Sequence, residues 1–105
     1  MHEPFFTSHF GRKEKKLTKK NAELKRRIEE AIGEICNAPE KSKLLKGEFE
    51  GKRSYSFGNY RIVFAICGEC RRRGFVRLNR CRDCGEKPDN SLVFFDIEHR
   101  KRVYK

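Results

Sequence analysis

Apolar residues recur every three or four positions between residues 22 and 35. Leu24, Ile28, Ile32 and Ile35 are spaced by four, four and three, which is the pattern of one apolar stripe on a helix. Asn21 stands where an N-cap would stand. Residues 11–21 are expected to form a separate, highly polar helix. Pro39, in the sequence NAPEK, should end the helical region. The pattern predicts a helical hairpin between about residues 9 and 36.

The rest of the chain has the pattern of strands. Residues 60–66 (YRIVFAI) and 90–100 (NSLVFFDIEHR) are rich in β-branched and aromatic residues, and residues 47–57 (GEFEGKRSYSF) precede a Gly-Asn turn. Residues 3–8 (EPFFTS) are expected to form a short strand. Pro4 favours an edge position for this strand, because proline lacks the N–H that pairs within a sheet. Short turns imply an antiparallel sheet, so we expect one α+β domain over residues 1–105, with the helical hairpin on one sheet face.

Alternation along each strand predicts which side chains face the helices. In residues 60–66 the helix-facing set is Tyr60, Ile62, Phe64 and Ile66. In the last strand we expect the helix-facing set to be Val93, Phe95 and Ile97. The side chains expected on the opposite, open face are Arg61, Val63, Ala65, Leu92, Phe94, Asp96, Glu98 and Arg100. This register places Arg61 and Arg100 on the same open face.

Charge points to a polyanionic partner. The chain has 26 Lys and Arg against 15 Asp and Glu, a formal net charge of +11. By itself this charge suits nucleic acid, an anionic membrane or an acidic protein equally. No apolar run approaches the roughly 18 residues that cross a bilayer, and the N-terminus lacks the pattern of a signal peptide. We therefore expect a cytoplasmic protein that is not bound to a membrane.

Residues 67–84, CGECRRRGFVRLNRCRDC, contain two Cys-x-x-Cys pairs. Four thiolates at this spacing favour one structural Zn²⁺ bound by Cys67, Cys70, Cys81 and Cys84, in a zinc ribbon inserted between the last two strands. Such a site has no open position for catalysis. The alternatives are unrelated thiols or an iron site. The fifth thiol, Cys36, continues the apolar stripe and is expected to be buried and inert.

The same segment is crowded with arginines. They could grip phosphate, since the guanidinium fork matches phosphate oxygens, or they could be the solvated surface of a zinc site. The sequence favours neither. The residues are Arg71, Arg72, Arg73, Arg77, Arg80 and Arg82.

Three short motifs, in this order and spacing, resemble the RelE/ParE toxin superfamily. They are LKG at residues 45–47, GNYRI at 58–62 and HRKRVY at 99–104, and the helix ELKRRIEEAIGEI also fits. Asn59 stands where members commonly have Asp, and most members lack the cysteine-rich insertion. The resemblance covers nearly the whole chain and implies the RelE-like fold.

The resemblance also implies a function. It predicts the toxin of a type II toxin-antitoxin system, a ribosome-dependent endoribonuclease whose substrate 2′-OH attacks the adjacent phosphate of mRNA, with no small-molecule cofactor. The implied partners are an antitoxin, the ribosome and mRNA. The alternatives are a ParE-like toxin that acts on DNA gyrase, or a non-catalytic zinc-ribbon module that binds RNA or protein.

The candidate catalytic residues are mostly cations, which can clamp phosphate and stabilise the phosphorane. Arg61 and Arg100 are the expected phosphate clamps, with Lys46, Lys52 and Arg53 expected at the other side of the open face. A lysine crowded by arginine could act as a base. His99 shares the Ile97 side and is expected to be structural, while His2 and His9 read as ordinary surface residues. The predicted catalytic set is Arg61, Arg100, Lys46, Lys52, Arg53 and Tyr104, the last of these for stacking or proton transfer.

Overall fold

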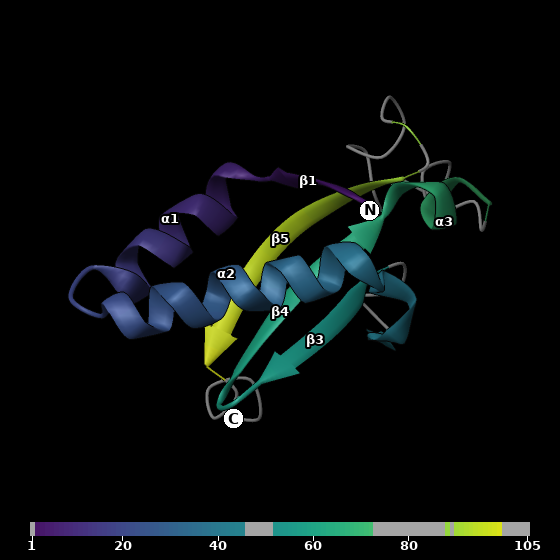
Figure 1. Cartoon of the computed structure of the whole chain (residues 1–105). Coiled ribbons are helices and arrows are strands. Elements are labelled where there is room, and N and C mark those ends of the chain that lie inside the picture. Colours follow the sequence, from purple (N-terminus) through teal and green to yellow (C-terminus); the bar gives the residue numbers. More distant parts are fainter. Residues whose placement is uncertain (1, 46–51, 73–87, 89, 100–105) are drawn as a thin grey trace.

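The computed structural model describes residues 2–45, 52–72, 88 and 90–99. In this part of the chain a five-stranded sheet has the order β1-β5-β4-β3-β2, and helices α1 and α2 pack against one of its faces (Figure 1). The elements are β1 (Glu3–Phe6), α1 (Ser8–Thr18), α2 (Ala22–Asn37), the 3₁₀ turn η1 (Pro39–Lys41), β2 (Lys43–Leu44), β3 (Arg53–Phe57), β4 (Tyr60–Ile66), α3 (Cys67–Arg72) and β5 (Ser91–His99).

The predicted helical hairpin is confirmed. The Thr7 hydroxyl accepts a hydrogen bond from the Phe10 N–H at 3.2 Å and begins α1. The Asn21 side chain accepts one from the Leu24 N–H at 2.9 Å and begins α2, as the sequence predicted. These caps satisfy backbone donors that a helix leaves unpaired at its start.

The main core lies between α2 and the sheet. Leu24, Ile28 and Ile35 of α2 are buried against the helix-facing side chains of β4 and β5, and Phe10 of α1 closes the end of the cluster. The predicted β4 set is confirmed: Ile62, Phe64 and Ile66 are buried, and Tyr60 packs at the margin.

A β-bulge interrupts the pairing of β4 with β5. Val63 lies opposite Asp96, but the next residue, Phe64, lies opposite Phe94. Phe95 is therefore an extra residue without a partner on β4. An extra residue reverses the alternation of side chains on the bulged strand.

The bulge overturns part of the face prediction for β5. Leu92 and Phe94 belong to the helix-side core, whereas Val93 is buried in a second cluster and Phe95 packs against that cluster. Assigning Val93 and Phe95 to the helix side was wrong, because the sequence offers no signal for the bulge. Beyond the bulge the predicted alternation returns, and Ile97 is in the core as expected.

The sheet is not entirely antiparallel. β1 pairs with β5 in parallel, with Glu3 opposite Ser91 and Phe6 opposite Phe94. The helical hairpin takes the chain from β1 to the far edge at β2, and three antiparallel pairings bring β5 back beside β1. β1 lies at an edge, as Pro4 predicted. The strand β1 is shorter than expected, and β2 and α3 were not predicted. Of the strand expected within residues 47–57, residues 47–51 lie outside the described residues, and β3 occupies Arg53–Phe57.

Across the described ranges, none of the helices has the length and apolar character needed to cross a bilayer.

Candidate functional site

A cleft of about 420 Å³ opens on the sheet face opposite the helices. Arg61 and Val63 of β4 point into it because their neighbours Ile62 and Phe64 point into the helix-side core. The other lining residues are Thr7, His9, Lys52, Phe95, Asp96 and Glu98. The cleft therefore combines an apolar floor with charges of both signs.

Two of the predicted catalytic cations lie in this cleft. Arg61 stands directly across the ladder from Glu98. Its Nε is buried and has no hydrogen-bond partner within the described part of the chain. Lys52 holds its Nζ 4.9 Å from the centre of the Phe95 ring, within the range of a cation–π contact. The guanidinium of Arg61 borders the cleft, and its fork of N–H donors is suited to binding an oxyanion.

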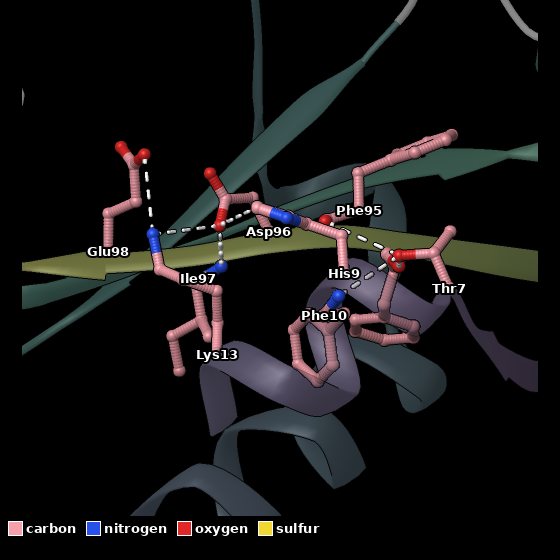
Figure 2. A network of polar contacts seen from close by, with 9 residues as sticks. Thr7, His9, Phe10, Lys13, Phe95, Asp96, Ile97 and Glu98 are labelled. Carbon is pink, nitrogen blue, oxygen red and sulfur yellow. Dashed lines mark hydrogen bonds and ion pairs between the residues drawn. The ribbon is translucent and has the colours of Figure 1, made fainter. Parts of the chain in front are cut away.

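Asp96 is the centre of a polar network between α1 and β5 (Figure 2). His9 Nε2 lies 3.2 Å and Lys13 Nζ 3.3 Å from Asp96 Oδ1, and that oxygen accepts a hydrogen bond of 2.9 Å from the Ile97 N–H. Lys13 Nζ also lies 3.7 Å from Glu98 Oε1. The network joins two carboxylates at the edge of the cleft.

The two carboxylates have pKa values shifted in opposite directions. Burial raises the pKa of Asp96, but a hydrogen bond from Glu98 and the charge of Lys13 outweigh it, so this pKa lies below its usual value. The hydrogen bond to Asp96 raises the pKa of Glu98, and burial adds to that effect, against the opposing charges of Lys13 and Arg61. The pair therefore favours one shared proton, which resides on Glu98 when it is present.

Sequence reasoning missed His9, Lys13, Asp96 and Glu98 as site residues. His9 was read as an ordinary surface residue, although His9 and Lys13 are four apart on α1 and so share a helix face. The available signal was that Asp96 and Glu98 flank Ile97, which puts two acids on one face of a strand. What the sequence does not show is that α1 lies beside this part of β5.

Arg53 lies away from the cleft. It pairs across from Phe64, so it faces the helix side, whereas the adjacent Lys52 faces the cleft. Its Nε and Nη2 donate to the two carboxylate oxygens of Glu69 at 2.9 and 2.7 Å, and Nη1 donates to the Ser42 carbonyl at 2.7 Å. The expectation that Arg53 lies on the open face was wrong, because strand alternation directs it toward α3 and η1.

His99 lies where strand alternation predicted. Its ring packs edge-on against Tyr60, with centroids 5.1 Å apart, and it lines a smaller hollow with Leu17 and Ile97 on the helix side. Cys36 is buried as expected, and burial raises the pKa of its thiol.

The first cysteine pair is held close together. Cys67 and Cys70 are three residues apart in α3, are fully buried, and belong to one cluster with Ala65 and Val93. In residues 2–45, 52–72, 88 and 90–99 no group of three or more metal-ligating side chains is present. Two of the four predicted zinc ligands are not in these ranges, so the zinc site stays a prediction.

Several predicted residues lie outside the described residues. They are Lys46, Arg100, Tyr104, Cys81 and Cys84, together with Arg73, Arg77, Arg80 and Arg82 of the cysteine-rich segment. Arg72, at the end of α3, is exposed.

No protein-family model matches the sequence, and no curated protein matches it either. A solved structure does match the fold of this chain. A chain of the toxin-antitoxin complex RelBE2 from Mycobacterium tuberculosis superposes with a TM-score of 0.64 and 22% sequence identity, over 94% of this chain and 98% of that chain. The chain therefore has a RelE-like fold.

Proposed function

We propose that this chain is the toxin of a type II toxin-antitoxin system and that it cleaves mRNA on the ribosome. The fold supports the proposal, since the matching RelBE2 structure is a toxin-antitoxin complex and the match spans nearly the whole of both chains. The observation that carries the proposal is the position of Arg61, which lines an open cleft together with a second cation, Lys52.

The cleft can supply what RNA cleavage needs from a protein. Attack of a 2′-OH on the adjacent phosphate builds negative charge on the phosphorane oxygens, and cations placed beforehand stabilise that charge. Arg61 is the main phosphate ligand in this proposal, and Lys52 is the second cation. Val63 and Phe95 give an apolar floor on which a base can lie.

We propose an acidic antitoxin as the partner that neutralises the toxin. The net charge of +11 favours such a partner. The open face with Arg61 and Lys52 is the surface that it would cover.

We also propose that Cys67, Cys70, Cys81 and Cys84 bind one structural zinc ion. The first pair supports this, because both thiols are buried side by side in one helical turn. A bound ion would tie the cysteine-rich segment to the end of β4 and would take no part in cleavage.

The test is primer extension on an mRNA in a purified translation reaction, with and without ribosomes. We expect new 5′ ends that require ribosomes, and a loss of roughly 10²–10³ in cleavage rate for Arg61→Ala. Arg26→Ala is the matched control. It removes the same charge from the exposed face of α2, where Arg26 pairs with Glu23 and Glu30, and it should cleave like the parent.

Undisturbed translation with folded protein would refute the proposal. Inhibition of supercoiling by DNA gyrase would then point to a ParE-like toxin. RNA binding without cleavage would point to a binding module.

A further inference from the structure

We infer that Glu98 accepts the 2′-OH proton during RNA cleavage, and that Asp96, held in place from α1, is the positioning residue for Glu98. This inference rests on the proposed endoribonuclease function. It adds a base to a site that otherwise offers cations.

The position of Glu98 relative to Arg61 supports the role of a base. The two residues are directly opposed on β5 and β4, and both line the cleft. A phosphate bound by Arg61 therefore lies beside Glu98, and the attacking 2′-OH belongs to the nucleotide joined to that phosphate. Glu98 keeps 32% of its side chain exposed, so a substrate can reach it.

Asp96 is too well bound to be the base itself. One of its oxygens is within hydrogen-bonding distance of His9, Lys13 and the Ile97 N–H, and 23% of its side chain is exposed. A carboxylate fixed by three donors stays ionised and keeps its orientation. It can therefore serve as a fixed negative charge and acceptor next to Glu98.

The charges around Glu98 come from every element that meets at the cleft. Negative charge raises the affinity of Glu98 for a proton, and positive charge lowers it. The groups are Asp96 on β5, Lys13 and His9 on α1, Arg61 on β4, and Lys52 ahead of β3. The raised pKa of Glu98 shows that Asp96 and burial outweigh the cations. A carboxylate base is more effective when its pKa lies closer to the working pH.

The proposed step is balanced. Glu98 takes the proton from the 2′-OH as the O2′–P bond forms, and the P–O5′ bond breaks with its electron pair remaining on O5′. The ammonium group of Lys52 gives O5′ its proton. Solvent water then carries the proton from Glu98 back to Lys52, and the products are a 2′,3′-cyclic phosphate and a 5′-OH.

The experiment measures single-turnover cleavage of a synthetic mRNA on programmed ribosomes as a function of pH, from the acidic to the weakly alkaline side of neutrality. Each variant is compared with the parent protein on the same ribosomes, so effects of pH on the ribosome cancel. Glu98→Gln should lower the rate by roughly 10²–10⁴-fold, with an unchanged melting temperature.

Two further variants should move the acidic limb of the rate profile in opposite directions. Asp96→Asn removes a negative charge and should shift the limb to lower pH, whereas Lys13→Met removes a positive charge and should shift it to higher pH. Lys16→Met, on the exposed side of α1, is the control and should leave the limb in place. A merely structural role of Asp96 and Lys13 would lower the rate equally at every pH.

The outcomes separate this inference from the proposed function. Full activity of Glu98→Gln with an inactive Arg61→Ala would overturn the role of Glu98 and leave the nuclease standing. Limbs that do not move in Asp96→Asn and Lys13→Met would overturn the positioning role of Asp96. Absence of cleavage by the parent protein would remove the proposed function, and this inference with it.

Discussion

The ion pair between Arg53 and Glu69 should be a major contributor to the free energy of unfolding. Its removal therefore tests whether Arg53 has a structural role. The side chains are only 11% and 7% exposed, and they share two hydrogen bonds, of 2.7 and 2.9 Å. Arg53 also donates to the carbonyls of Ser42 and Glu40. One guanidinium therefore connects β3, α3 and the segment that follows α2.

The magnitude follows from what each substitution leaves behind. Arg53→Ala leaves the Glu69 carboxylate buried without this counter-ion and removes the donor to the Ser42 carbonyl. Breaking a buried pair from one side costs about 3–5 kcal/mol. For a chain of this size that corresponds to a fall in melting temperature of about 15 °C or more. Replacing both partners with apolar residues of similar volume, as in Arg53→Met with Glu69→Leu, should restore much of the loss.

The assay is urea unfolding of both single variants and the double variant, with Lys52→Ala as the control. Lys52 is adjacent in sequence but faces the cleft, so its removal costs only the cation–π contact with Phe95 and should change the free energy of unfolding by less than about 1 kcal/mol. If Arg53→Ala were as stable as the parent protein but inactive in RNA cleavage, the structural role of Arg53 would be refuted. The result would instead favour the catalytic role that the sequence predicted for Arg53.

Three further predictions concern the metal, a turn and a tyrosine. The purified protein should contain one zinc per chain by elemental analysis, and Cys67→Ser should lose the metal and melt at a lower temperature while Cys36→Ser keeps it. Gly58 has φ +55°, so Gly58→Ala should lower the free energy of unfolding by about 1–2 kcal/mol and Gly58→Asn by less, measured by urea unfolding. A hydrogen bond to Glu34 raises the pKa of Tyr55 to about 12. This pKa is above the unfolded value, so the contribution of the bond is complete below about pH 10 and lost as pH rises toward 12. Ultraviolet titration should show that Tyr55→Phe removes a tyrosine with a pKa of about 12.

Local sequence patterns were enough to predict the elements whose formation depends on their own residues. The stripe of Leu24, Ile28 and Ile35 identified α2 and its buried face, and Asn21 marked its start. The run of residues 60–66 coincides with β4. In each case the periodicity of the side chains and the cap are properties of neighbouring residues, so they can be read without knowing the tertiary structure.

The errors have a different physical origin, because they depend on contacts between distant segments. The bulge at Phe95 exists only in the pairing of β5 with β4, and it exchanged the faces of Leu92, Val93, Phe94 and Phe95. Strand alternation did place Arg61 correctly on the open face, because no bulge lies within β4. Strand alternation also explains why the open-face assignment of Arg53 was wrong. Adjacent residues on a strand face opposite ways, and Lys52 already faces the cleft.

The bulge also explains why the acidic half of the cleft forms. Without the extra residue, an unbroken alternation from Leu92 and Phe94 in the helix-side core would turn Asp96 and Glu98 toward that core as well. The bulge turns both acids to the open face beside Arg61, and it returns Ile97 to the core. The edge of β5 next to Asp96 is then free for α1, because β1 ends at Phe6 and its partner is Phe94. The Thr7 hydroxyl donates to the Phe94 carbonyl at 3.0 Å, which fixes the start of α1 so that His9 and Lys13 reach Asp96. A single irregular residue in one strand therefore connects the fold to the charge arrangement on which the proposed chemistry depends.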